Sequence, residues 1–379
     1  MSEAEALNQQ LIDKLTDAGM LTDRWRPAFL AMPRHRFVPD LIWADTDDGG
    51  LTTRRREDDP AAWLETAYAD EPIVTQVDDG ATPDTGRGRL VTSSISKPSI
   101  VARMLAYLQV EPGMRVLEIG TGTGWNAALL AHTAGEQNVT TIEVDPVIAD
   151  RARKTLAEAG ITPTVVTGDG ADGHAPGAPY DRIIATAAVQ HIPYAWVEQT
   201  RPGGLILTPW GTAYDNGALV RLTVDEYGTA HGLFIDNTVA FMWLRAQRTP
   251  RPQPPTDLTG AAESSTTLHP DAVAWDDLDA SFAVGLRLPE VARRFIDADD
   301  GTDDFTFWAF AGQSWACVQV AEGTTAHRVL QYGPRRLWEE IEAAYRWWKK
   351  VGQPSTLQFG LAVHPDRQYV YLDSPDNPV

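Results

Sequence analysis

Short apolar runs alternate with helix-like segments from residue 115 onward, and this alternation restricts the possible folds more than any other feature. RVLEIG (115–120), VTTIEVD (139–145) and YDRIIATAA (180–188) are largely apolar and too short for helices, as expected of strands buried on both faces. WNAALLAHTA (125–134) and VIADRARKTLAEAG (147–160) lie between them and predict helices. Strands interleaved with helices indicate a parallel sheet covered on both sides. We therefore expect an α/β fold built on a doubly wound, mostly parallel sheet.

Upstream of this sheet the sequence predicts helices and loops. Residues 3–18 have the apolar spacing of an amphipathic helix, and the polar stretch 45–62 predicts a surface loop. SISKPSIVARMLAYL (94–108) predicts a further helix. Ser94 or Ser96 would cap its N-terminus, and the proline suits the first turn because no backbone N–H is needed there.

A proline-dense stretch, RTPRPQPPTDLTG (248–260), is typical of a linker. Beyond it, short strand-like runs, a helix from Pro334 and a final strand pair predict an α+β appendage. We expect Trp338, Trp347 and Trp348 of this helix to be core residues, with a peptide-binding groove as the alternative. The expected parts are an N-terminal helical and loop region that contributes to the substrate site (1–90), the core (91–246), the linker (247–262) and a C-terminal α+β domain (263–379).

Charge and composition exclude several classes of partner. The net charge is −20, from 52 acidic against 32 basic residues, so the chain repels phosphate backbones and anionic membranes, and we expect no nucleic-acid or membrane partner. The N-terminus lacks signal-peptide features, and no apolar stretch approaches the roughly 20 residues of a membrane span, which predicts a cytoplasmic protein. The eight histidines show no metal-ligand spacing, so we expect no metal. We expect a monomer.

Gly120, Gly122 and Gly124 follow the first predicted strand of the core and precede a helix. Glycines in such a turn let a ligand approach the backbone, and the helix N-terminus offers unpaired N–H groups. The simplest alternative is a tight strand–helix connection without a ligand. A dinucleotide fingerprint needs G-x-G-x-x-G. Its last position falls on Trp125, or on Ala127 in the relaxed G/A form, so the spacing disfavours a dinucleotide without excluding it.

Three acidic residues, Glu118, Glu143 and Asp169, lie at the carboxyl ends of predicted strands, where doubly wound sheets bind ligands. Glu118 would repel a pyrophosphate but tolerates a cationic or zwitterionic ligand. Glu143 can accept both hydroxyls of a ribose, and Asp169 can accept an adenine amino group. Each alone is more often a solvated loop residue. Together, in this order, they favour S-adenosylmethionine, whose product is S-adenosylhomocysteine.

Several segments resemble the protein-L-isoaspartate O-methyltransferase family. They are PRHRFVP (33–39), AYADEPIVTQ (67–76), SISKPSIVARML (94–105), VLEIGTGTGWNAALLA (116–131), GDG (168–170) and YDRIIATAAVQHIP (180–193). The resemblance implies a Rossmann-like class I methyltransferase core. It also implies that SISKP corresponds to the family's T-I-S-x-P segment, in which Ser96 lies beside the methyl-accepting carboxylate. Ser94 in place of threonine, Lys97, and the longer stretch 74–93 in place of a GxGQ segment are departures from the family pattern.

The expected mechanism needs no general base, because a carboxylate with a reference pKa of about 4 is already ionised near neutral pH. Ser96 would hold one carboxylate oxygen while the other points at the methyl group; the alternative is that Ser96 merely caps the helix. The expected site comprises catalytic Ser96; cofactor-binding Ser94, Ile95, Glu118, Gly120, Thr121, Gly122, Thr123, Gly124, Glu143, Val144, Asp169 and Gly170; and substrate-binding Asp70, Lys97, Ala187 and Ala188.

Two C-terminal stretches, LWEEIEAAYRWWKKVGQP (337–354) and QFGLAVHPDRQYVYLDSP (358–375), resemble the extension of bacterial family members that act on ribosomally synthesised peptides. That resemblance implies methylation of an aspartate side chain in a cyclised peptide, followed by closure to a succinimide that persists or opens to isoaspartate. The appendage would then recognise the peptide substrate. The alternatives are isoaspartate repair on damaged proteins, a small-molecule methyltransferase, and a non-catalytic cofactor-binding module.

Overall fold

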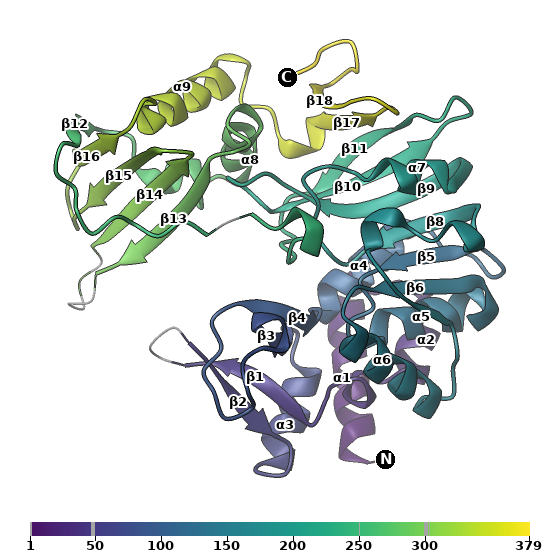
Figure 1. The fold of residues 1–379 in the computed structure, drawn as a ribbon. Coiled ribbons are helices and arrows are strands. Elements are labelled where there is room, and N and C mark those ends of the chain that lie inside the picture. Colours follow the sequence, from purple (N-terminus) through teal and green to yellow (C-terminus); the bar gives the residue numbers. More distant parts are fainter. Residues whose placement is uncertain (1, 47–49, 250, 299–301, 303) are drawn as a thin grey trace.

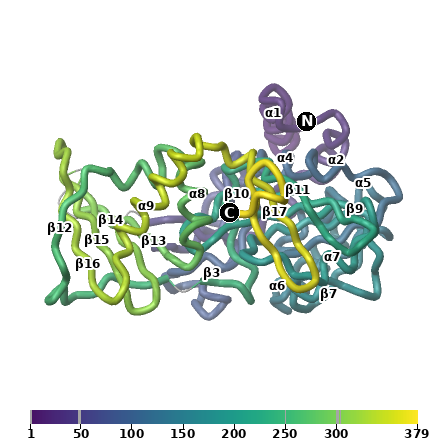
Figure 2. The backbone as a smooth tube through the Cα atoms, turned by 90° about the horizontal axis from the view of Figure 1, so that it is seen from above, coloured from purple at the N-terminus to yellow at the C-terminus, as the bar shows by residue number. Residues whose placement is uncertain are grey.

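The computed structural model describes residues 2–46, 50–249, 251–298, 302 and 304–379. They form three sheets: a four-stranded sheet near the N-terminus, a nine-stranded central sheet, and a five-stranded sheet near the C-terminus. Figure 1 shows the N-terminal sheet below the central one and the C-terminal sheet to its upper left, and Figure 2 shows the C-terminal part projecting to one side. Within the described residues, no helix is long and apolar enough to cross a membrane.

The central sheet has the order β18-β17-β11-β10-β9-β8-β5-β6-β7. The parallel half consists of β5 (Val116–Ile119), β6 (Val139–Glu143), β7 (Thr164–Thr167), β8 (Tyr180–Ala185) and β9 (Thr200–Trp210). The doubly wound sheet predicted from the alternating runs is confirmed. The other half is antiparallel, beginning with the hairpin of β10 (Ala218–Val224) and β11 (Ala230–Asp236).

Helices cover both faces of the central sheet. Consecutive side chains of each buried strand point to opposite faces, so both faces carry apolar side chains that must be buried. Ile184 and Leu207 pack in the core that contains α4 (Pro98–Leu108) and α5 (Trp125–Ala134). Ile183 and Ile206 pack on the opposite face with α7 (Tyr194–Glu198) and Phe282 of α8 (Leu278–Arg287). Asp145 caps the N-terminus of α6 (Pro146–Glu158), because its carboxylate accepts the N–H groups of Val147 and Ile148.

The N-terminal sheet differs from the predicted helical and loop region. α1 (Glu3–Asp17) confirms the first helix, and α2 (Arg26–Ala31) follows it. The sheet has the order β2-β1-β3-β4, formed by β1 (Leu41–Asp45), β2 (Leu51–Arg55), β3 (Ile73–Val77) and β4 (Val91–Ile95). The prediction of a surface loop over residues 45–62 was wrong in part, because this stretch contains β2 and the start of α3 (Pro60–Tyr68). Residues 47–49 of the stretch lie outside the described residues.

The C-terminal part contains the antiparallel strands that were predicted, in the order β12-β16-β15-β14-β13. They are β12 (Ala262–Thr266), β13 (Ala292–Asp297), β14 (Phe305–Ala311), β15 (Ser314–Val320) and β16 (His327–Tyr332), packed against α9 (Leu337–Lys350). Trp338 and Trp348 of α9 are buried and Trp347 is half-buried, which favours the core interpretation of this helix. Of the linker stretch, Pro250 lies outside the described residues.

The final strand pair, β17 (Phe359–Val363) and β18 (Gln368–Leu372), was placed in the appendage, and this placement was wrong. β17 pairs antiparallel with β11 of the central sheet. Phe359 is fully buried there, and its ring lies 5.5 Å from that of Phe282. Without β17 the backbone groups along one side of β11 would be an open sheet edge, and the final strand pair covers it.

Replacing Phe359 with alanine removes a buried ring that joins β17 to α8, so we expect the free energy of unfolding to fall by about 3–5 kcal/mol. Leu357→Ala, at a side chain that is 51% exposed two residues away, should change it by less than about 0.5 kcal/mol. Urea denaturation followed by tryptophan fluorescence measures both. Equal small losses would show that β17 does not hold the C-terminal segment on the core.

Candidate active site

The glycine turn after β5 adopts backbone conformations that only glycine accepts readily. Gly120, Gly122 and Gly124 all have positive φ, of 95°, 53° and 89°. A Cβ at Gly120 would lie 2.8 Å from the hydroxyl oxygen of Thr186, and one at Gly122 would lie 3.6 Å from the carbonyl oxygen of Ser94. The turn therefore lies in direct contact with β4 on one side and with the end of β8 on the other.

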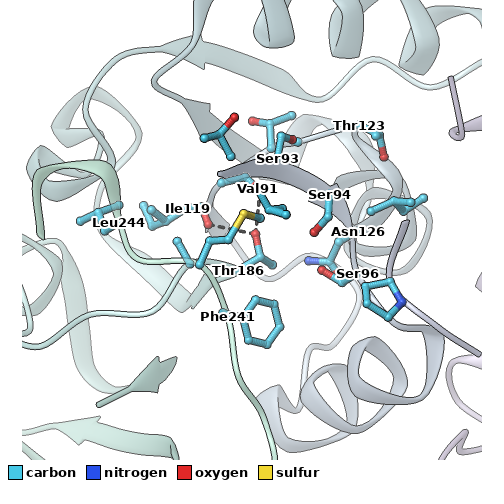
Figure 3. A pocket seen from close by; sticks show the side chains of 18 of the residues that line it. Val91, Ser93, Ser94, Ser96, Ile119, Thr123, Asn126, Thr186, Phe241 and Leu244 are labelled. Atoms are coloured by element: carbon cyan, nitrogen blue, oxygen red, sulfur yellow. Dashed lines mark hydrogen bonds between the residues drawn. The ribbon is translucent and has the colours of Figure 1, made fainter. Parts of the chain in front are cut away.

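A cavity of about 520 Å³ opens between the glycine turn, the end of β4 and the segment after β11. Figure 3 shows Ser94, Ser96 and Asn126 gathered on one side of it, Leu244 on the other side with Ile119 and Thr186 between, and Phe241 below Thr186. The predicted site residues that line the cavity are Ser94, Ile95, Ser96, Lys97, Gly120, Thr121, Gly122, Thr123, Glu143, Val144, Gly170 and Ala187. The structure thus brings most of the predicted cofactor-binding residues into one pocket.

Glu143 lies at the end of β6 with its carboxylate close to the glycine turn. One carboxylate oxygen accepts the N–H of Gly122 at 3.0 Å and the other accepts the N–H of Asp145 at 3.1 Å. Burial raises the pKa of the Glu143 carboxyl above its ordinary value, while these two hydrogen bonds lower it. A carboxylate fixed in this way retains lone pairs that can accept hydroxyl groups from the cavity.

Five of the predicted residues do not line the cavity: Glu118, Gly124, Asp169, Asp70 and Ala188. Glu118 is fully buried below the turn, where its carboxylate accepts hydrogen bonds from Asn126 at 2.7 Å and Thr141 at 2.5 Å. Asp169 is exposed and accepts the N–H of Ala171 at 2.9 Å. Neither carboxylate lines the cavity in this geometry, and Glu118 supports Asn126, which does line it.

The SISKP segment is strand and turn rather than helix. Ser94 belongs to β4, where it pairs with Val74, and α4 begins at Pro98 without a side-chain cap from either serine. The N–H of Ser99 is instead accepted by the carboxylate of Asp70 at 2.8 Å. The capping roles proposed for Ser94 and Ser96 were therefore wrong, and Asp70 supports the start of α4 from a neighbouring loop.

Sequence reasoning missed one complete wall of the pocket. We call residues 238–248 the strap, because they run from β11 towards the linker and line the cavity with Thr238, Ala240, Phe241, Met242, Trp243, Leu244, Arg245 and Arg248. Ala188 holds the strap in place: its N–H donates to the carbonyl of Met242, and its carbonyl accepts the N–H of Leu244, both at 2.8 Å. The only signal in the sequence was the apolar run FMWL between the hairpin and the linker.

The strap is also tied to the N-terminal sheet by an ionic cluster. Arg248 makes a two-pronged contact with Asp79, at 2.7 and 3.0 Å, and Arg245 contacts the same carboxylate at 3.1 Å. Hydrogen bonding to Arg248 helps to hold the pKa of the Asp79 carboxyl below its usual value. Asp79 lies in the stretch 74–93, between β3 and β4, so the cluster joins the strap to that part of the N-terminal sheet.

The family of the chain follows from comparison with known proteins. The family described as protein-L-isoaspartate(D-aspartate) O-methyltransferase (PCMT) matches residues 51–238. A protein-L-isoaspartate O-methyltransferase from Thermococcus onnurineus is 36% identical over 215 residues, covering 56% of this chain and 81% of the relative. One from Staphylothermus marinus is 34% identical over 243 residues, covering 61% and 92%. The chain belongs to the protein-L-isoaspartate O-methyltransferase family.

Membership of this family makes the protein a carboxyl methyltransferase whose cofactor is S-adenosylmethionine. The pocket fits that cofactor: a turn with glycine at three alternate positions, a buried carboxylate at Glu143 and a largely apolar wall face one cavity. A solved structure named protein-L-isoaspartate O-methyltransferase shares the fold with a TM-score of 0.55 at 22% identity, covering 97% of this chain and all of that one. The similarity of fold thus extends into the C-terminal part.

The buried Glu118 predicts a pH dependence of stability. Burial raises the pKa of its carboxyl from 4.5 to about 7. Because the folded-state pKa is the higher one, its contribution is fully present below pH 4.5 and is lost as the pH rises through about 7. Relative to Glu118→Gln, the wild type should lose about 3 kcal/mol across this interval. Urea denaturation at a series of pH values measures it, with exposed Glu322→Gln as control; parallel curves for wild type and Glu118→Gln would contradict it.

The ionic cluster predicts a change in cofactor exchange. Asp79→Asn removes the charge that Arg245 and Arg248 share, so we expect S-adenosylhomocysteine to dissociate about 2- to 5-fold faster at low salt. Stopped-flow measurement of release should show this difference shrinking at high salt, because exposed charges are screened. Glu263→Gln, which breaks the two-pronged contact with Arg328 in the C-terminal sheet, is the matched control. Unchanged release in Asp79→Asn would show that the cluster does not close the pocket.

Proposed function

We propose that this enzyme methylates the free carboxylate of an L-isoaspartyl residue in a protein or peptide. The observation that carries the proposal is the meeting of two segments in one cavity. The SISKP segment contributes Ser94, Ser96 and Lys97. The glycine turn lies so close to it that a Cβ added to Gly122 would be 3.6 Å from the Ser94 carbonyl oxygen. The relatives that match this core carry the name of that reaction.

The reaction requires alignment and exclusion of water rather than proton transfer. When bound, the cofactor would supply a methyl group on a sulfonium. A carboxylate oxygen would attack the methyl carbon in line with the C–S bond, whose electron pair goes to sulfur, to give a methyl ester and S-adenosylhomocysteine. The half-buried Ser96 donates a hydrogen bond to the second carboxylate oxygen and so fixes the attacking one. The strap and β4 keep bulk water from the reacting atoms, and Glu143 holds the ribose.

The step after methylation needs no further group from the protein. Methoxide leaves more readily than hydroxide, so the nitrogen of the following peptide bond attacks the ester carbonyl and closes a five-membered succinimide with loss of methanol. Hydrolysis of that ring yields aspartyl and isoaspartyl products. Repeated cycles therefore convert isoaspartyl residues into aspartyl residues.

The competing hypothesis is methylation of an ordinary aspartate in a cyclised ribosomal peptide. It rests on the two C-terminal stretches at 337–354 and 358–375. A solved structure with the repair enzyme's name spans 97% of the chain, so the C-terminal part does not by itself favour a ribosomal peptide. The second stretch also completes the central sheet through β17, which gives it a structural role. The cytoplasmic location and the monomeric state stay predictions.

Replacing Ser96 with alanine removes one hydrogen bond to a charged group. We expect the turnover of an isoaspartyl peptide to fall about 10- to 100-fold. The affinity for S-adenosylhomocysteine, measured by isothermal titration calorimetry, should stay within about 2-fold because the glycine turn and Glu143 are unchanged. Ser264→Ala, on the exposed face of β12, is the control. Full activity of Ser96→Ala would remove Ser96 from the mechanism.

Substrate preference separates the two hypotheses. Three peptides of one sequence, carrying isoaspartate, aspartate, or aspartate within a side-chain-linked ring, are compared by methyl ester formation in mass spectrometry. We expect kcat/KM for the isoaspartyl peptide to exceed both others by about 100-fold or more, since a shaped site rejects a displaced carboxylate strongly. A preference for the cyclised aspartyl peptide would overturn the repair function and establish the competing one.

A further inference from the structure

A buried arginine lies beside the SISKP segment and makes no contact with the cavity. Arg34 begins the short helix η1 (Arg34–Arg36), and only 1% of its surface is exposed. Its two terminal nitrogens donate to five described acceptors, all of them backbone carbonyls. These are Ala67 at 3.0 Å, Ala69 at 3.1 Å, Glu71 at 2.8 Å, Ile95 at 3.3 Å and Ser96 at 3.0 Å.

The five carbonyls belong to the two segments that shape the substrate side of the pocket. Ile95 and Ser96 lie at the end of β4, in the SISKP segment itself. The other three surround Asp70, whose carboxylate accepts the N–H of Ser99 and so sets the start of α4. Arg34 therefore holds the middle of the SISKP segment through its carbonyl groups, while Asp70 holds its C-terminal end through the N–H of Ser99.

Arg34 also contacts the helix that follows the glycine turn. Its guanidinium carbon lies 5.5 Å from the ring centroid of Trp125, the first residue of α5. The indole N–H of Trp125 donates to the carbonyl of Met32, two residues before Arg34. One side chain thus contacts both the SISKP segment and the helix that follows the glycine turn.

Only a guanidinium suits this place. Carbonyl oxygens are acceptors alone, so five of them directed at one point repel each other unless a cation with several donors lies between them. The planar guanidinium supplies such donors in a fixed geometry, whereas an ammonium supplies three from a single atom. Burial lowers the pKa of Arg34 to about 9, so the side chain stays charged at neutral pH and its hydrogen bonds are of the stronger, charge-assisted kind.

We propose that Arg34 is a positioning residue for methyl transfer, acting through Ser96. By fixing the carbonyls of Ile95 and Ser96 it sets the backbone from which the Ser96 hydroxyl reaches the acceptor carboxylate. This inference rests on the function proposed above for Ser96. It assigns to the PRHRFVP stretch a role in turnover and not in cofactor binding, since neither Glu143 nor the glycine turn contacts Arg34 directly.

The test compares Arg34→Lys with Arg36→Lys in the full-length protein. Arg36 lies on the same short helix, is exposed, and donates only to the carbonyl of Glu158 at 2.7 Å among its described hydrogen bonds. We expect Arg34→Lys to lower kcat for the isoaspartyl peptide about 10-fold or more, with KM and the affinity for S-adenosylhomocysteine within about 3-fold. Arg36→Lys should leave all three unchanged. Turnover is expressed per S-adenosylhomocysteine-binding site, so loss of folded protein does not enter the comparison.

A double-mutant cycle with Ser96→Ala tests the route of the effect. If Arg34 acts through Ser96, the double variant should be no slower than the slower single variant. The positioning role would be overturned if the reductions in kcat of the two single variants multiplied in the double variant, or if Arg34→Lys left kcat unchanged. It would also be overturned if the Arg34→Lys protein no longer bound S-adenosylhomocysteine at all. Full activity in Ser96→Ala would instead refute the proposed role of Ser96, so the two failures are distinguishable.

Discussion

The turn after β5 is joined to the end of β6, and the rest of the pocket depends on this junction. The N–H groups of Gly120 and Thr121 both donate to the carbonyl of Ile142, and the N–H of Gly122 donates to the carboxylate of Glu143. Parallel pairing makes β5 and β6 end at the same edge of the sheet, so the floor of the cavity is set by main-chain hydrogen bonds. Any shift of the turn would break these bonds and move Glu143 with it.

The walls above this floor come from segments that are distant in the sequence. β4 belongs to the N-terminal sheet, the strap follows β11, and the loop 187–188 follows β8. Arg34 and Asp70 fix the first wall, Ala188 fixes the second, and Asp79 joins the two. The C-terminal part is connected to the pocket through the strap, and it returns to the core through β17.

The sequence predicted the central sheet and the floor of the site, because both depend on local patterns. Short apolar runs identify buried strands, and three alternate glycines identify a turn with positive φ. The inward direction of Glu118 was not predictable, since a strand buried on both faces shows no alternation that would assign its sides. The position of Ser94 in β4 depends on pairing with Val74, twenty residues away, and not on its neighbours.

Sequence patterns also failed to predict the roles of three other features of the site: Asp70, the strap and Arg34. The capping of α4 by Asp70 and the five carbonyls around Arg34 are contacts through space that no spacing in the sequence encodes. The strap has neither helical nor strand periodicity, so its apolar run gave no element to place. One carboxylate oxygen of Asp169 accepts the N–H of Ala171, a local hydrogen bond that short acidic side chains often make and that the sequence reasoning did not consider.

A crystal structure of the protein with S-adenosylhomocysteine and an isoaspartyl peptide would show whether the SISKP segment receives the substrate carboxylate opposite the glycine turn. We expect the ribose hydroxyls on Glu143, the cofactor sulfur in the cavity beside the glycine turn, and a carboxylate oxygen within about 3 Å of the Ser96 hydroxyl. A peptide carboxylate bound elsewhere, beyond the reach of Ser96, would contradict the proposed function.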